Sequence, residues 1–156
     1  MHSNIIQISK NPIDREDWVT PSDFYDNSQD FADYIGDTKS DEQRKEIIKW
    51  LADTFKGIFE LEGETLIYKG LGRFIRDWND EIKRLTLYLD NNKYNGIHLY
   101  KIAQATRETH LSICSRFYIE DWNDWTGAAD DFISFLSNSM REGDRLYIGA
   151  VIDYHF

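Results

Sequence analysis

Five aspartates near the N-terminus recur at intervals of three and four residues. They are Asp23, Asp26, Asp30, Asp33 and Asp37. Residues three and four apart share one face of an α-helix, so a helical segment would carry these carboxylates in a row. At a rise of about 1.5 Å per residue, the row would extend about 20 Å with a negative charge every ~5 Å. Like charges at this spacing repel each other, so the pattern favours a surface that binds something cationic.

A second acid-rich stretch, residues 117–140, holds five acidic residues and no basic one. Its aspartates join the first row as candidate binding residues: Asp121, Asp124, Asp130 and Asp131. Tryptophan is favoured in protein interfaces, where its burial contributes strongly to binding. Three tryptophans on expected loops among these acids are therefore candidate interface anchors: Trp18, Trp122 and Trp125. The alternative interpretation places these three at the edge of the core.

The charge of the whole chain agrees in sign with these two stretches. The chain has 28 acidic and 18 basic residues, a net charge of −10. Residues 1–42 hold ten acidic residues against three basic ones, so most of the excess lies there. Such a protein is repelled by nucleic acid and by anionic membranes, and it is attracted to basic clefts. We therefore expect a partner with a basic protein surface, and neither direct nucleic-acid binding nor membrane binding.

The side chains that usually carry catalysis or bind metals are few and scattered. The four histidines, His2, His98, His110 and His155, show no metal-binding spacing, and a single cysteine, Cys114, excludes a structural zinc site. Glycine-rich phosphate-binding signatures are absent as well. We therefore expect no metal, no cofactor and no catalytic residues. An enzyme with a carboxylate-based site is the less favoured alternative.

The N-terminal half contains signals for a strand and several helices. Residues 5–8 are rich in isoleucine, which predicts a short strand. Thr20 and Pro21 suit a helix start, and the spacing of the aspartates favours a helix from there that ends at Gly36. Asn27 and Ser28 are weak helix formers, so a broken helix or a loop is the alternative for this segment.

Clearer patterns follow. Ser40 and Gln43 form a capping-box pattern before a helix whose apolar residues, including Trp50, recur at helical spacing as far as Phe55. A small hairpin is expected over 59–68, with Gly63 in its turn, and another helix follows Gly72.

After Gly96 the apolar period changes to about two, which predicts a strand hairpin over 97–119. A short helix with Phe132 and Phe135 facing inward is expected next, followed by a C-terminal strand over 145–154 that is buried on both faces. The predicted fold is α+β: one domain over 1–156, with three to four helices packed on a mostly antiparallel sheet. No apolar run reaches the ~20 residues that span a bilayer, so a cytoplasmic protein is expected.

In size and charge the chain resembles the small acidic antirestriction and anti-CRISPR proteins of phages and mobile elements, although no shared motif carries this resemblance. It implies a DNA or phosphate mimic that inhibits a nuclease, or another nucleic-acid-binding protein, by occupying its basic channel. The alternative is a generic interaction or immunity-type module that binds through exposed tryptophans with an acidic rim. These two hypotheses differ in whether nucleic acid and this protein compete for the partner.

Overall fold

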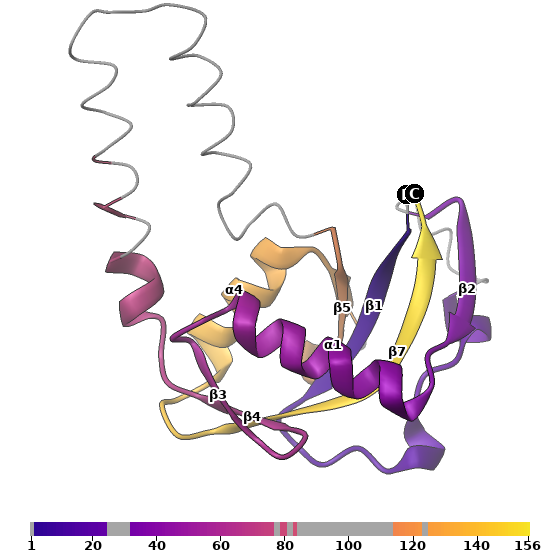
Figure 1. Ribbon diagram of the computed structural model, residues 1–156, viewed down its shortest axis with the longest axis horizontal. Helices are drawn as coiled ribbons and strands as arrows, with labels where there is room; N and C mark the ends of the chain where they lie inside the picture. The colour runs from indigo at the N-terminus through magenta and orange to yellow at the C-terminus, as the bar shows by residue number, and fades with distance from the viewer. Residues whose placement is uncertain (1, 25–31, 77–78, 81–82, 84–113, 123–124) are drawn as a thin grey trace, which may run out of the picture.

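The sheet is organised around one long strand near the C-terminus, β7 (Arg145–His155). The computed structural model describes residues 2–24, 32–76, 79–80, 83, 114–122 and 125–156. β7 runs antiparallel to β1 (His2–Ser9), from the pair His2 and His155 to the pair Ser9 and Tyr147 (Figure 1). As the apolar pattern predicts, the middle of β7 is buried on both faces.

Seven strands form one sheet within the described residues, in the order β3-β4-β7-β1-β5-β6, with β2 as a further partner of β7. The remaining strands are β2 (Tyr34–Thr38), β3 (Phe59–Glu62), β4 (Thr65–Tyr68), β5 (Arg116–Ile119) and β6 (Trp125–Gly127). β1 and β5 are parallel, and the other pairings are antiparallel. The predicted α+β fold with a mostly antiparallel sheet is therefore confirmed.

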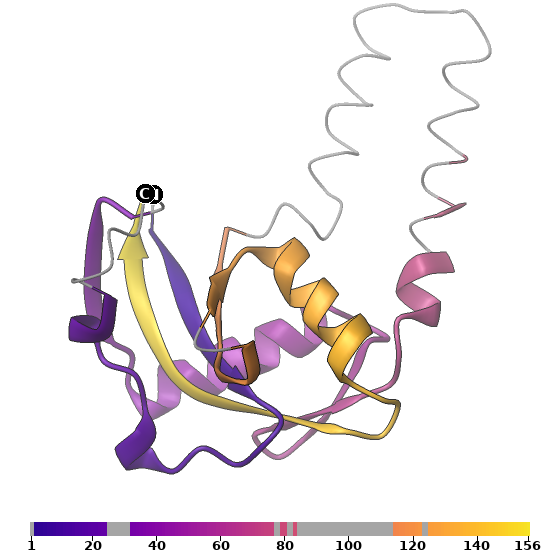
Figure 2. The ribbon, with the colours of Figure 1, turned by 180° about the vertical axis from the view of Figure 1, so that it is seen from behind.

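Two helices, α1 (Asp41–Thr54) and α4 (Ala129–Ser139), cover one face of the sheet (Figures 1 and 2). α1 begins at the predicted capping box, in which Ser40 and Gln43 bond each other's backbone. The chain turns after α1 at Gly57, whose φ of 88° favours glycine. Phe132 of α4 stacks on Phe117 of β5 at 4.2 Å between ring centroids, in the middle of the larger core cluster.

The opposite face of the sheet is covered by the N-terminal segment, which contains the 3-10 helices η1 (Arg15–Asp17) and η2 (Pro21–Phe24). Val19 and Phe24 from this segment are buried with Ile152 and Tyr154 of β7 in a second, smaller core cluster. The acid-rich N-terminal segment is therefore fixed to the sheet by apolar contacts, which leaves its charged side chains to face solvent.

The helix predicted from Thr20 to Gly36 is not what the structure contains. η2 is a single 3-10 turn, and Tyr34–Thr38 is a strand that pairs with β7. Ile35 lies opposite Tyr154 and is only 5% exposed. Pairing with the edge of β7 gives this β-prone segment backbone hydrogen bonds and buries Ile35. This stabilisation outweighs any local preference for a helix, which the spacing of the aspartates only suggested. Residues 25–31 lie outside the described part of the chain.

The other predicted elements fare better. Both hairpin strands are present, with Gly63 in the turn, and α4 buries Phe132 and Phe135 as expected. Trp50 was expected in the core but is 38% exposed, so that prediction was wrong. Residues 72–76, 79–80 and 83 are helical as predicted. Of the predicted strand hairpin over 97–119, only the end that forms β5 lies within the described residues.

Two buried polar side chains complete the sheet at its irregular points. The pairing of β1 with β7 shifts by one residue at Gln7, and its carboxamide oxygen accepts the backbone N–H of Ala150 at 2.8 Å. β4 and β2 flank β7 on the same side but leave Ile148 and Gly149 without a strand partner there. The guanidinium of Arg44 from α1 donates to both carbonyls. No helix among the described residues is long and apolar enough to cross a membrane.

Candidate functional site

The aspartates of the predicted row do not lie on one helix. Asp23 sits in η2, where its Oδ2 accepts hydrogen bonds from the Thr20 N–H at 2.6 Å and from the Thr20 hydroxyl at 2.9 Å. Asp33 precedes β2 and Asp37 lies within it, and both are exposed. Asp26 and Asp30 lie outside the described residues. The predicted row of aspartates on one helix face is therefore not formed at Asp33 and Asp37.

Two of the three basic residues of the N-terminal segment, Arg15 and Lys39, are bound to other acids. Arg15 makes a two-pronged contact with Asp41, at 3.1 Å and 3.0 Å, and the Lys39 ammonium lies 2.8 Å from Asp153. Besides Asp23, whose carboxylate accepts hydrogen bonds from Thr20, five exposed acids of the N-terminal segment take part in no ion pair within the described part of the chain. These residues, the N-terminal acids, are Asp14, Glu16, Asp17, Asp33 and Asp37.

The β3–β4 hairpin shows the opposite behaviour. Its three glutamates are all ion-paired: Glu60 with Lys69, Glu62 with Arg145, and Glu64 with Arg44 and Lys45. Partial burial opposes ionisation of Glu64, but its hydrogen bond to Arg44 outweighs this and lowers its pKa. The protein thus neutralises its acids at the hairpin and leaves those of the N-terminal segment uncompensated.

The second acid-rich stretch meets the N-terminal segment in space. It includes η4 (Glu120–Trp122) directly after β5. Asp121 accepts the backbone N–H of Lys10 at 2.8 Å, and the Gln7 carboxamide bridges the Asp17 carbonyl and the Glu120 carboxylate. Asp121 therefore lies beside the residues that lead into η1. Two segments more than a hundred residues apart in sequence contribute acids to the same region.

The two aspartates on α4 form no hydrogen bond or ion pair with this region among the described residues. Asp131 caps α4 by accepting the Ala128 N–H at 2.9 Å, and Asp130 is exposed in the first turn of that helix. A carboxylate is favourable at this end of a helix, where the helix dipole is positive. Asp124 lies outside the described residues.

Two of the three candidate tryptophans, Trp18 and Trp122, are half-buried and contact other residues of the protein. Two guanidinium groups lie over the ring of Trp18, with Arg15 at 5.1 Å and Arg44 at 5.0 Å from its ring centroid. The Trp122 indole N–H donates to Ser139 at 3.2 Å, and its ring meets Phe135 edge-on. Both therefore occupy the edge of the core in this structure. The side chain of Trp125 is outside the described part of the molecule.

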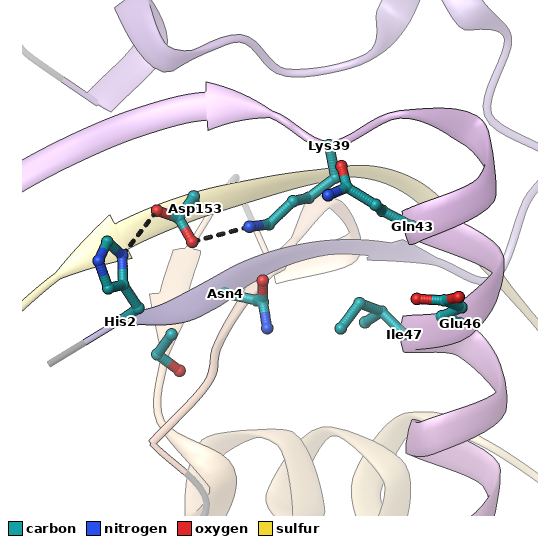
Figure 3. Close-up of a pocket in the computed structure, with 8 residues that line it drawn as sticks. His2, Asn4, Lys39, Gln43, Glu46, Ile47 and Asp153 are labelled. Atoms are coloured by element: carbon teal, nitrogen blue, oxygen red, sulfur yellow. Dashed lines mark hydrogen bonds and ion pairs between the residues drawn. The ribbon is translucent and has the colours of Figure 1, made fainter.

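A polar cavity of about 280 Å³ opens where the two ends of the chain meet α1 (Figure 3). β1 and β7 form one side, α1 forms another, and Lys39 lies on the segment that leads into α1. The lining residues are His2, Ser3, Asn4, Lys39, Gln43, Glu46, Ile47 and Asp153. Sequence reasoning missed this cavity because only the pairing of β1 with β7 brings residues 2–4 beside residue 153.

Asp153 is the most strongly held charge of the cavity. Its carboxylate contacts the Lys39 ammonium at 2.8 Å and the His2 ring nitrogen Nδ1 at 3.0 Å. Partial burial by itself raises the pKa of Asp153, but the hydrogen bonds and charges of Lys39 and His2 outweigh burial and lower it. Asp153 therefore stays ionised at neutral pH and joins β7, β1 and the start of α1.

Comparison with protein-family models, with curated proteins and with solved structures found no match. The function must therefore be argued from the site itself. Among the residues that the structure describes, no three side chains of His, Cys, Asp or Glu are grouped so that they could hold a metal ion. The N-terminal acids and the cavity could therefore bind a partner through charge and hydrogen bonds.

Proposed function

We propose that this is a small acidic binding protein whose N-terminal acids engage a basic surface of another protein. The observation that carries the proposal is the lack of internal compensation. The N-terminal acids are exposed and unpaired within the described part of the chain, while Arg15 and Lys39 are bound to Asp41 and Asp153. A partner's lysines and arginines would supply the missing countercharges.

The physical effect of this arrangement acts at long range. Uncompensated charges on one segment add to the potential of a chain with a net charge of −10, which attracts cationic surfaces and speeds their encounter. The apolar contacts of Val19 and Phe24 hold the segment on the sheet, so its charges are presented without ordering a free loop on binding. Binding of this kind is fast and weakens as salt is added.

The narrower form of the proposal is that the partner binds nucleic acid and that this protein inhibits it by occupying the basic channel. Its support is the sign and density of the exposed charge. The helical spacing that would imitate a phosphate backbone no longer supports it, because Asp33 and Asp37 lie at and within a strand. Occupying a channel requires only that the acids reach its lysines and arginines together.

The test is comparative capture from an extract of the source cells. The wild type is immobilised beside two variants of equal net charge. One variant neutralises three N-terminal acids (Glu16→Gln, Asp33→Asn, Asp37→Asn). The other neutralises three exposed acids on α1 and on the turn before β7 (Glu42→Gln, Asp53→Asn, Glu142→Gln). We expect a basic protein that the wild type and the second variant capture and the first does not. Equal capture by all three would show that the N-terminal acids are not the binding surface.

Competition then tests the narrower form. Duplex DNA or single-stranded RNA is added to the complex with the captured partner, at constant ionic strength so that screening does not change. A channel occupied by this protein predicts mutual displacement. Simultaneous binding of nucleic acid and this protein would reject mimicry while leaving the acidic binding surface in place.

A further inference from the structure

The charged side chains that line the cavity beside β1 and α1 leave one carboxylate without a countercharge among the described residues. Two of its charged residues, Lys39 and Asp153, lie 2.8 Å apart and cancel each other. Asp153 also binds His2, so its carboxylate is engaged on both oxygens. The remaining carboxylate in the lining is Glu46, which is exposed and makes no ion pair with another described residue. The cavity therefore favours a cation.

The hydrogen-bonding groups of the cavity point to a planar donor. The Asn4 carboxamide makes no hydrogen bond with the side chains or loops described, so its oxygen is free to accept. The Gln43 carboxamide oxygen is already engaged, because it accepts the Ser40 N–H at 3.0 Å. Figure 3 shows Asn4 on β1 across from Ile47 and Glu46 on α1. Two acceptors and an apolar side chain thus line one cavity.

We infer that this cavity receives the side chain of an arginine presented by the basic partner. A guanidinium offers five donors in a rigid plane, which can bond the Glu46 carboxylate and the Asn4 oxygen together. Its methylene chain would pack on Ile47. A lysine ammonium presents a compact charge without this planar fork, so it fits the two separated acceptors less well. The inference rests on the proposed function only in taking the partner to be basic.

The position of the cavity connects it with the N-terminal acids. Gly36 of β2 lies against Asp153. A side chain at residue 36 would begin only 3.1 Å from the Asp153 Cβ. Asp37 follows on the same strand, and Lys39 begins the cavity wall two residues later. A partner that binds Asp37 on β2 would therefore have the cavity within reach of a neighbouring side chain.

The test uses N-acetyl-L-arginine amide, which carries the side chain without the backbone charges of the free amino acid. It is titrated into the isotope-labelled wild type at constant ionic strength and followed by NMR. We expect saturable shift changes at Asn4, Gln43 and Glu46, with a dissociation constant on the order of millimolar. Glu46→Gln should weaken binding about five- to tenfold, because it removes a charge-assisted hydrogen bond.

Glu42→Gln is the matched control, because Glu42 is exposed one turn earlier on α1 and does not line the cavity. It should change the affinity by less than about twofold, since an exposed charge outside the site contributes little. Equal weakening by Glu42→Gln and Glu46→Gln, or shifts that do not saturate, would overturn the inference, because general attraction to an acidic protein would then explain the result.

Two further probes define the ligand. N-acetyl-L-lysine amide should bind more weakly than the arginine probe, and equal binding would overturn the preference for a guanidinium. Free L-arginine should bind no more tightly than its blocked form. Tighter binding of free arginine would make a free amino acid the ligand and overturn the side-chain assignment. These probes act on the isolated protein, so their failure leaves the captured partner and the N-terminal acids untouched.

Discussion

Gln7 shows how much of this fold depends on one polar side chain. It is fully buried, and its oxygen accepts the N–H groups of Val19 at 3.1 Å and of Ala150 at 2.8 Å. Its amino group donates to the Asp17 carbonyl at 3.0 Å. One carboxamide therefore joins the irregular point of the β1–β7 pairing to the N-terminal segment that carries most of the N-terminal acids.

Replacing this residue should be costly. In Gln7→Ala the N–H groups of Val19 and Ala150 lose their acceptor in a buried place. A buried donor without a partner costs about 1–3 kcal/mol, so we expect the free energy of unfolding to fall by about 2–5 kcal/mol in urea denaturation. Gln43→Ala, which removes only half of the exposed capping box of α1, should cost about 1 kcal/mol. Equal losses in the two variants would contradict the role assigned to Gln7.

The ion pairs of Asp153 predict a pH dependence. Its pKa in the folded protein lies below the ordinary value of 3.8, so the charged form is favoured by folding. The stability that this provides is present above pH 3.8 and is lost as the pH falls through the lower, folded-state pKa. Asp153→Asn should therefore reduce the free energy of unfolding at pH 7 by about 1–2 kcal/mol. In urea denaturation this difference should disappear in strong acid, and a difference that stays constant down to about pH 2 would contradict it.

Sequence reasoning could have found some of these residues and not others. Gln7 is the polar member of an isoleucine run, Ile5 to Ile8, that is predicted to be a strand, and a polar residue in a buried run must find partners. The cavity had no such signal. His2, Lys39 and Asp153 meet only because β1 and β7 pair across nearly the full length of the chain. No local pattern encodes that pairing.

Among the elements, α1 does more than cover the sheet. The side chain of Arg44 extends from α1 into the gap between β4 and β2. Its Nε donates to the Gly149 carbonyl at 2.7 Å, and the same guanidinium binds the Ile148 carbonyl and Glu64. The sequence indicates that Arg44 faces the core. It precedes the buried residues Ile48 and Leu51 by four and seven positions, so it shares their face of the helix. An arginine on an apolar face has to be paired.

This role can be measured with a matched pair of variants. Arg44→Met leaves the Ile148 and Gly149 carbonyls without this donor, and each buried polar group left unpaired costs about 1–3 kcal/mol, so we expect a loss of about 2–5 kcal/mol. Lys45→Met removes an exposed cation that also pairs with Glu64, at 3.2 Å, and should cost no more than about 0.5 kcal/mol. Chemical denaturation of both variants decides the matter. A loss in Arg44→Met as small as that in Lys45→Met would refute the role of Arg44 in the sheet.

The segment over 22–36 shows where local pattern fails as a guide to elements. Its aspartates repeat at helical spacing, yet Tyr34 and Ile35 are β-prone, and Ile35 is buried beside Tyr154. Exposed charges do not fix a secondary structure, because they face solvent equally well from a helix or an edge strand. The α1 helix and β7 were predictable because their apolar residues, which do face the core, set the period.

For the whole molecule, the uneven charge predicts a gain in stability when it is reduced. The N-terminal acids repel one another and the remaining excess acids, so the triple variant Glu16→Gln, Asp33→Asn, Asp37→Asn should melt at the same temperature as the wild type or a few degrees higher. Salt screens this repulsion, so the difference should shrink between about 10 mM and about 500 mM sodium chloride. A clear loss of stability would mean that these acids serve the fold and are not available to a partner.

The affinity of the captured partner is the most direct test of the central claim, that the N-terminal acids form a binding surface for a basic protein. Calorimetric titration at about 50 mM and about 200 mM salt would compare the wild type, this triple variant and the variant Glu42→Gln, Asp53→Asn, Glu142→Gln. We predict binding at least about tenfold weaker and less salt-sensitive for the first variant, and within about twofold of wild type for the second. Equal affinities and equal salt dependence for both variants would contradict the claim.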